Sequence, residues 1–320
     1  MKILLLGANG QLGQTFLCQG GLARRGELVA ASRDGRLAVG EARAVVGDLS
    51  DLTGLQALLG AEQPDLVINA AAYTSVDKAE SDEDMATRVN GEAPGVIGQW
   101  AAQQGALVIH YSTDYVFPGD ASDPYPTDAP TGPQGAYGRS KFAGEEALRH
   151  SGAPHLILRT AWVYSAVGHN FLRTMLRLGA NRDELSVVAD QHGTPTTTTL
   201  IVEGTLAAID RYTATDADPT ALTGTFHLTA SGETTWHGFA EAIFAGATAV
   251  GLMEKSPTVH PIASSEFPTP ARRPAYSVLD NREFTTTFGY PLADWRDGLH
   301  ATLSQLSTKK RGCHVDSPHP

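Results

Sequence analysis

A glycine-rich turn near the N-terminus constrains the fold of this chain more than any other feature. The short apolar run Ile3–Leu6 leads into Gly7-Ala8-Asn9-Gly10-Gln11-Leu12-Gly13, where a helix is expected to begin. At this spacing Gly7 permits a sharp turn, Gly10 lets backbone N–H groups approach a pyrophosphate, and Gly13 lets the helix pack against the strand. The helix N-terminus adds partial positive charge. The turn therefore predicts a dinucleotide site, although a glycine-rich turn without a ligand has the same pattern.

Strand-length apolar runs alternate with helical stretches through the first half of the chain. We expect strands at Lys2–Leu6, Leu28–Ala31, Ala44–Val46, Asp65–Asn69, Leu107–Tyr111 and His155–Leu158, and helices at Gln11–Ala23, Leu52–Leu59 and Met85–Gln104. Such alternation is typical of βαβ units whose parallel sheet is covered on both faces. The predicted fold is α/β, a Rossmann-like doubly wound parallel sheet with a smaller C-terminal substrate-binding lobe.

The regular alternation ends near Ala161, beyond which Pro and Gly become frequent. We expect residues 1–160 to form an NADP(H)-binding domain. Residues 161–306 are expected to form mainly a substrate-binding lobe, with some elements returning to the first domain. The polar residues 307–320 are expected to form a flexible tail.

Composition excludes several classes of function. The net charge of −11 argues against nucleic-acid binding, which needs a basic face. No apolar run reaches the roughly 18 residues that a membrane span needs, so no membrane partner is expected. The only cysteines, Cys18 and Cys313, lie far apart, and no metal motif is present. We therefore expect a cytoplasmic protein without a metal site.

The end of the second predicted strand bears on the choice of cofactor. An acidic residue there contacts the ribose of NAD, whereas arginine suits the 2′-phosphate of NADP. Ser32 and Arg33 stand at this position and favour NADPH, but Asp34 follows directly and leaves NADH possible. Asp48 and Leu49, after the third strand, are expected to meet the adenine. The alternative for Asp48 is a helix N-cap, a role that Ser50 or Asp51 also suits.

Tyr137 and Lys141 are four residues apart at the start of a predicted helix and share one face. A nearby cation lowers the pKa of a phenol, which makes it a better acid–base group. Ser112, Thr113 and Asp114 end the fifth predicted strand, where ligands of open α/β sheets bind. The Thr113 hydroxyl is placed to donate to a substrate carbonyl, although a capping turn is the alternative.

Five segments together resemble the dTDP-4-dehydrorhamnose reductase family, in order and over nearly the whole chain. They are Asn69-Ala70-Ala71-Ala72-Tyr73-Thr74-Ser75-Val76-Asp77-Lys78-Ala79-Glu80, His110 to Gly119, Tyr137 to Glu145, Arg159-Thr160-Ala161-Trp162-Val163-Tyr164 and Pro268-Thr269-Pro270-Ala271-Arg272-Arg273-Pro274. The resemblance implies NADPH-dependent reduction of the C4 ketone of dTDP-4-dehydro-β-L-rhamnose to dTDP-β-L-rhamnose. The partner would thus be a dTDP-sugar.

The resemblance also implies roles for individual residues. Tyr137 would donate the proton, Lys141 would hold the nicotinamide ribose and tune Tyr137, and Thr113 would bond the C4 oxygen. Asp114 would contact the sugar and Trp162 would pack against the substrate. Other residues would line the cofactor, namely Gly10, Gln11, Leu12, Asp48, Leu49, Ala72, Tyr73, Thr74 and Tyr111. Arg273, in a proline-rich loop, suits the substrate diphosphate because guanidinium groups grip phosphate.

One departure concerns the Mg²⁺-linked dimer that some family members form through glutamates. This chain has Thr15 in the first helix and Thr196 to Thr199 where such residues are expected. Because a hard cation needs carboxylates, Mg²⁺ is doubtful, and we expect a monomer or a metal-free homodimer. Two alternatives remain, namely another sugar-nucleotide reductase or epimerase on this scaffold and a non-catalytic regulatory subunit.

Overall fold

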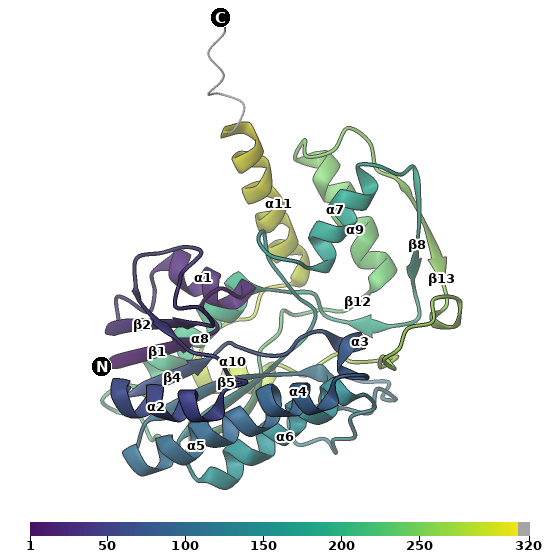
Figure 1. Cartoon of the computed structure of the whole chain (residues 1–320). Helices are drawn as coiled ribbons and strands as arrows, with labels where there is room; N and C mark the ends of the chain where they lie inside the picture. The colour runs from purple at the N-terminus through teal and green to yellow at the C-terminus, as the bar shows by residue number, and fades with distance from the viewer. Residues whose placement is uncertain (313–320) are drawn as a thin grey trace, which may run out of the picture.

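A seven-stranded sheet in which every neighbouring pair of strands is parallel lies at the centre of the structure (Figure 1). The computed structural model describes residues 1–312, with side chains to residue 308. Across the sheet the strands are β11 (Gly224–His227), β6 (His155–Thr160), β5 (Leu107–Thr113), β4 (Leu66–Asn69), β1 (Lys2–Leu6), β2 (Glu27–Ser32) and β3 (Arg43–Val46). The strand order runs outward from β1 in both directions. This order confirms the predicted Rossmann-like sheet and places its switch point between β1 and β4.

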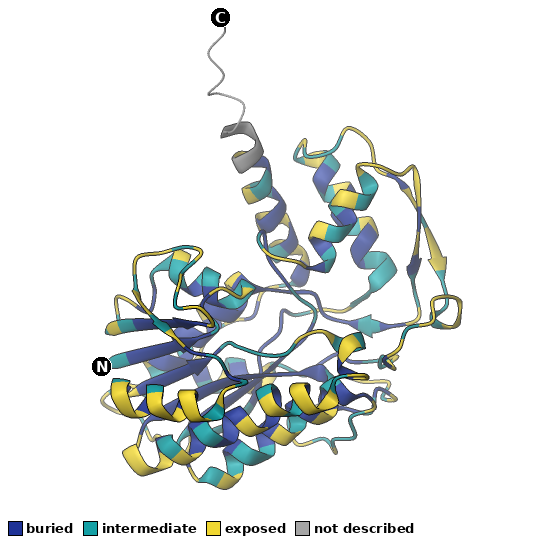
Figure 2. Ribbon diagram, viewed as in Figure 1, coloured by how far each residue is buried: buried dark blue, intermediate teal, exposed yellow. Residues whose placement is uncertain are grey.

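Helices cover both faces of the sheet (Figure 1). One face carries α2 (Leu52–Glu62), α5 (Ala93–Gln104) and α6 (Ala136–Ser151), and the other carries α1 (Gln11–Gln19), α8 (Thr198–Tyr212) and α10 (Arg282–Phe288). Successive side chains of a strand point to opposite faces. Leu4 and Leu6 of β1 therefore pack in the core between the sheet and α2, α5 and α6, while Ile3 and Leu5 pack in the core between the sheet and α1, α8 and α10. Figure 2 shows the buried strands between helices whose outer faces are exposed.

A second lobe lies above the carboxyl edge of the sheet (Figure 1). Its helices are α7 (Phe171–Gly179), α9 (Trp236–Ala249) and α11 (Trp295–Gly312). This part of the chain also contains three two-stranded sheets. They pair β7 (Val163–Tyr164) with β10 (Thr196–Thr197), β9 (His192–Gly193) with β12 (Thr234–Thr235), and β8 (Glu184–Val188) with β13 (Thr258–Ile262). The 3₁₀ turn η3 (Ser264–Glu266) follows β13. Because β11, α8 and α10 belong to the central sheet and its cover, the chain crosses between the two parts several times.

Several element boundaries differ from those predicted. Helix α1 ends at Gln19 rather than Ala23, because Gly20 adopts a left-handed φ of 64° and caps it. The helix predicted over Met85–Gln104 is divided into α4 (Glu83–Thr87), the π-helical turn η1 (Arg88–Glu92) and α5. Pro94 has no N–H for a helical hydrogen bond, and the Ala93 N–H bonds to Arg88 O, five residues back.

The C-terminal helix extends further than predicted. Residues 307–312, expected in the tail, belong to α11. The rest of the predicted tail, including Cys313, lies outside the described residues. Among the helices that the structure describes, none is long and apolar enough to cross a membrane.

Candidate active site

The glycine turn between β1 and α1 forms a cradle lined by backbone. Gly7 has a φ of +81°, and a Cβ there would lie 2.6 Å from the Ala71 nitrogen. A Cβ on Gly13 would collide with Gly7 O and lie 2.7 Å from Ala8 Cα. Gly10 is the N-cap of α1 and supplies no side-chain cap, so the first N–H groups of the helix remain open to an anionic ligand. These residues fit the pyrophosphate of a dinucleotide.

Gln11, at the start of α1, also connects this turn to the second lobe. Its Oε1 accepts hydrogen bonds from Ser165 Oγ at 2.9 Å and from Asn170 Nδ2 at 2.7 Å. The next residue, Leu12, packs against the core on the face of the sheet that α1, α8 and α10 cover. The segment 165–170 therefore lies beside the expected pyrophosphate position, a proximity that the sequence pattern did not indicate.

At the end of β2, Ser32 is buried and Arg33 is exposed. The Ser32 hydroxyl donates to Arg36 O at 2.7 Å, which fixes the turn. The Asp34 carboxylate accepts from the Arg36 backbone N–H at 3.2 Å, and this bond is the first of the contacts that lower the pKa of Asp34. The Asp34 carboxylate thus stabilises the turn that follows β2, while the neighbouring Arg33 side chain is exposed.

Asp48 does not cap a helix. Its Oδ1 accepts from the backbone N–H of Ser50 at 2.9 Å, and Asp51 caps α2 by accepting from Gly54 N at 3.0 Å. Leu49 is buried in the core. The structure therefore removes the N-cap alternative for Asp48.

The segment Ala72–Thr74, after β4, is held by Asn90, a residue that the sequence reasoning missed. Asn90 Oδ1 accepts from the Tyr73 N–H at 2.8 Å, and its Nδ2 donates to Tyr73 O and to Ser140 Oγ, both at 3.0 Å. Asn90 lies in the π-helical turn η1 and is buried. The signal that the sequence offered was an asparagine just before Gly91 and Pro94 in an otherwise helical segment.

Thr113 ends β5, and Asp114 opens the 3₁₀ turn η2 (Asp114–Val116). Thr113 Oγ1 donates to Asp114 Oδ1 at 3.0 Å and accepts from the Tyr115 N–H at 3.2 Å, and it lies near enough to the Tyr137 phenol on α6 to act on the pKa of that phenol. Burial raises the pKa of Asp114 to about 6. The Asp114 Oδ2 atom is buried without a hydrogen-bond partner among the described residues. The three predicted residues are thus brought together at the carboxyl edge of the sheet.

The pKa of Tyr137 differs from expectation. We predicted that Lys141 would lower it, but burial raises it to about 12, and the nearby Thr113 hydroxyl only partly opposes this. The physical reason is that desolvation disfavours the phenolate. Tyr137 is therefore fully protonated at neutral pH, as a proton donor must be.

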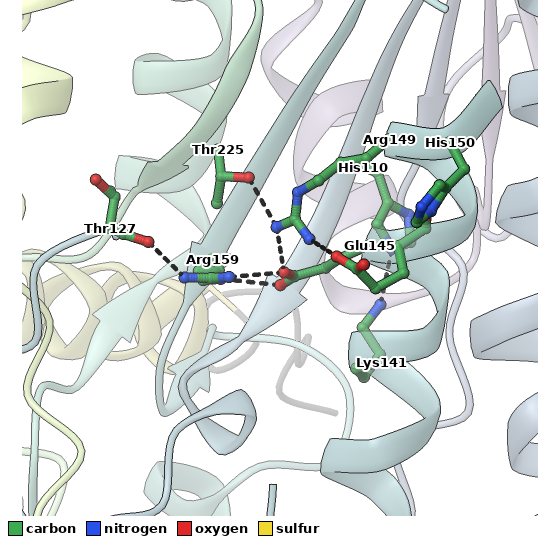
Figure 3. A network of polar contacts seen from close by, with 9 residues as sticks. His110, Thr127, Lys141, Glu145, Arg149, His150, Arg159 and Thr225 are labelled. Carbon is green, nitrogen blue, oxygen red and sulfur yellow. Dashed lines mark hydrogen bonds and ion pairs between the residues drawn. The ribbon is translucent and has the colours of Figure 1, made fainter. Parts of the chain in front are cut away.

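Lys141 projects from α6 toward β5 (Figure 3). Its Nζ donates to Tyr111 O at 2.6 Å and lies 3.3 Å from His110 Nε2. Only 2% of Lys141 is exposed, and burial lowers its pKa to about 8. Tyr111 therefore meets Lys141 through its carbonyl, while its hydroxyl pairs with Thr205 Oγ1 at 2.8 Å on the other side of the sheet.

Trp162, directly after β6 and Ala161, has a strained backbone with a φ of +45°. Its ring stacks on Trp236 of α9 with centroids 3.5 Å apart, and Gly193 packs against the ring so closely that a Cβ would collide with it. Strain of this kind persists where the surroundings impose it and clusters at ligand sites.

Arg273 is paired with Asp77 of α3 (Val76–Ala79), with Nη2 at 2.8 Å and Nη1 at 3.1 Å from its carboxylate oxygens. Burial opposes the charge, but Asp77 and the hydroxyl of Tyr115 raise the pKa of Arg273. Tyr115 in turn meets the Tyr137 ring edge-on at 5.7 Å. Arg273 is therefore near the site, but two of its nitrogens are already occupied by Asp77.

The comparisons with known proteins agree with this geometry. The family model described as RmlD substrate binding domain matches residues 1–308. A dTDP-4-dehydrorhamnose reductase of Burkholderia thailandensis is 46% identical, covering 96% of this chain and 99% of the relative.

Two solved structures are also similar over most of both chains. The dTDP-4-dehydrorhamnose reductase of Clostridium acetobutylicum has a TM-score of 0.83 at 35% identity, covering 96% of this chain and 99% of that one. That of Bacillus anthracis, in complex with NADP, has a TM-score of 0.81 at 30% identity, covering 95% and 99%. The chain belongs to the dTDP-4-dehydrorhamnose reductase family.

Proposed function

We propose that this chain uses NADPH to reduce the C4 ketone of dTDP-4-dehydro-β-L-rhamnose, giving dTDP-β-L-rhamnose. The observation that carries the proposal is the placement of the Tyr137 phenol beside the carboxyl end of β5, where the strand ends at Thr113 and the Tyr137 ring meets Tyr115 edge-on. Tyr137 and Thr113 each carry a hydroxyl group that is able to donate a hydrogen bond. They lie at the carboxyl end of β5, and ligands of open α/β sheets bind beyond the carboxyl ends of the strands. Family membership supplies the substrate class.

The chemistry follows from what each residue is able to do. NADPH, when bound, supplies the hydride that goes to C4. Thr113 holds the carbonyl oxygen by a hydrogen bond, and Tyr137 gives its phenolic proton to that oxygen, so that the ketone becomes a secondary alcohol. Lys141, one helical turn along, supplies positive charge that stabilises the phenolate left behind.

The glycine turn is proposed to hold the cofactor pyrophosphate, as its backbone-lined cradle suggests. The residues of the turn that would line the cofactor are Gly7, Gly10, Gln11, Leu12 and Gly13. The rest of the cofactor would be lined by Ser32 and Arg33, by Asp48 and Leu49, by Ala72, Tyr73 and Thr74, and, at the nicotinamide end, by Tyr111, Tyr137 and Lys141. Because Asp34 is engaged by its own turn, we favour Arg33 on a 2′-phosphate and hence NADPH, with NADH possible.

On the substrate side, Asp114 would contact the sugar and Trp162 would pack against it. Two nitrogens of the Arg273 guanidinium are bonded to Asp77. Arg273 would therefore bind the diphosphate either through its other N–H groups or after breaking its ion pair with Asp77. In this proposal residues 1–160 bind the cofactor and residues 161–306 mainly bind the substrate.

We further propose a cytoplasmic protein that is a monomer or a metal-free homodimer. Thr15 Oγ1 donates to Thr198 Oγ1 at 2.7 Å, so two hydroxyls meet where Mg²⁺ would need carboxylates. Sedimentation with and without EDTA tests this proposal, since a dimer that dissociates in EDTA would contradict it.

The experiment that tests the main proposal incubates the purified chain with NADPH and a panel of dTDP-sugars, following cofactor absorbance. We expect consumption with dTDP-4-dehydro-β-L-rhamnose and formation of the C4 alcohol. Conversion of a sugar without net NADPH consumption would indicate an epimerase instead. Cofactor binding without any conversion would indicate a regulatory subunit.

A further inference from the structure

We propose that Asn69 and His110 are positioning residues for Lys141, which present a hydrogen-bond donor to its amine and thereby let it release a proton while staying in place. The proposal rests on the proposed function only for its catalytic consequence. Asn69, His110 and Lys141 are each at most 2% exposed, so their hydrogen bonds are made within the protein. The three side chains form a row from the end of β4 across β5 to α6.

The orientation of the Asn69 amide determines which nitrogen of His110 carries the proton. The Ala71 N–H donates to Asn69 Oδ1 at 3.3 Å, so the Asn69 NH₂ group faces His110 Nδ1 at 3.1 Å. An NH₂ group only donates, and Nδ1 must therefore accept. The single proton of the neutral imidazole is then on Nε2, which faces Lys141 Nζ at 3.3 Å.

This arrangement matches a neutral amine better than an ammonium. A neutral amine accepts the His110 Nε2–H with its lone pair and still donates to Tyr111 O at 2.6 Å. An ammonium has three donors and no acceptor, so it would meet the Nε2–H as donor against donor. Relief would require the Asn69 amide to turn over, which would set its NH₂ against the Ala71 N–H.

The surrounding charges do not override this preference. Within the described residues, the carboxylate that raises the pKa of Lys141 is Glu145, one turn along α6. Glu145 is already shared by Arg159, at 2.7 and 2.9 Å, and by Arg149 at 2.7 Å (Figure 3). His155 on β6 acts on His110, and burial lowers the pKa of both imidazoles, so they stay neutral. Burial, which lowers the pKa of Lys141, thus acts in the same direction as the hydrogen bonds.

The consequence for turnover concerns the phenolate that Tyr137 becomes after donating its proton. A lysine that exchanges its proton near neutral pH is able to return one to that phenolate, because proton transfer is efficient when pKa values lie near the working pH. In this step an N–H bond of the ammonium breaks and the phenolic O–H forms. The neutral amine that remains is stabilised by His110 Nε2–H until solvent restores its proton.

The test is a titration of Lys141 itself, which does not need turnover. The chain has six lysines, and ¹³Cε-lysine NMR of the NADP⁺-saturated protein, with Lys141→Met to assign the signal, follows its ionisation. His110→Gln removes the fixed donor, because an amide presents either its oxygen or its nitrogen to Nζ. We expect the proton affinity of Lys141 to rise about tenfold, the effect of one hydrogen bond, and the basic limb of kcat to move upward with it.

His155→Gln is the matched control, because His155 is buried on the neighbouring strand and hydrogen-bonds to Ala153 O rather than to Lys141. It should leave the titration unchanged. An unchanged titration in His110→Gln, or the same shift in both variants, overturns the proposal.

If His110→Gln does not fold, Asn69→Asp tests the proposal instead. The aspartate still accepts the hydrogen bond from the Ala71 N–H, but it presents an acceptor to His110 Nδ1 in place of the NH₂ donor. It should raise the affinity of Lys141, and no rise overturns the proposal. Absence of reductase activity would refute the proposed function but would leave this titration readable.

Discussion

Replacing Lys141 by methionine should stabilise the fold at neutral pH, although it removes a residue of the active site. The side chain is 2% exposed, and burial lowers its pKa from 10.5 to about 8. At about 1.4 kcal/mol per pH unit, this difference destabilises the folded chain by about 3 kcal/mol wherever both states are protonated. Methionine fills a similar space without charge. Its cost is the lost hydrogen bond to Tyr111 O, about 1 kcal/mol.

The sign of the pH dependence follows from proton binding. Between the folded and unfolded pKa values the unfolded chain binds more protons, so the stability of the wild type rises with pH through that range. Lys141→Met should therefore be more stable than the wild type by about 2 kcal/mol near pH 7. The advantage should shrink by about 2 kcal/mol toward pH 9.5.

The assay for this prediction is urea-induced unfolding of both proteins at the two pH values, with the free energy of unfolding extrapolated to water. Groups that titrate alike in both proteins cancel in the difference. A stability difference that is the same at both pH values would refute the reasoning, because it would mean that Lys141 keeps an ordinary pKa in the fold.

Three further predictions concern catalysis and the cofactor. Tyr137→Phe should lower kcat by about 10²–10⁴-fold and leave NADPH affinity, measured by fluorescence titration, unchanged; full turnover would contradict its role as donor. Gly10→Ala should fold, because its Cβ would lie 3.3 Å from Gly7 O, but should weaken NADPH binding at least roughly tenfold by blocking the pyrophosphate. Gly60→Ala, whose Cβ would have no neighbour within 4 Å, is the matched control, and equal affinities would contradict the cradle. Arg33→Ala should raise the KM for NADPH roughly tenfold or more, as for a lost charge-assisted hydrogen bond, and leave that for NADH unchanged; an equal change in both would reassign Arg33.

The sequence predicted the fold well where the signal was local. The apolar runs Ile3–Leu6, Leu66–Asn69 and Leu107–Tyr111 are buried strands of a parallel sheet, as predicted, whereas the edge strand at Ala44–Val46 is largely exposed. The glycines of the first turn allow the close backbone approach that was expected. The sheet order and the positions of Thr113 and Tyr137 at one edge follow from that topology.

The parts that could not be predicted depend on tertiary contacts. The pKa of Tyr137 was assigned the wrong direction, because spacing along a helix shows the neighbouring lysine but does not show how deeply the phenol is buried. Asn90 was missed because its partners are distant in sequence. The pairing of Arg273 with Asp77 joins residues 196 positions apart, which no local pattern reports.

The most direct test of the proposed reduction follows a deuterium atom from the nicotinamide of NADPH to the sugar. The purified chain is incubated with dTDP-4-dehydro-β-L-rhamnose and NADPH carrying deuterium at the transferable position of the nicotinamide, and the product is analysed by NMR. If hydride goes from the nicotinamide to C4, dTDP-β-L-rhamnose should carry one deuterium at C4 for each NADPH oxidised. A product without deuterium at C4, or label at another carbon of the sugar, would contradict the proposed reduction.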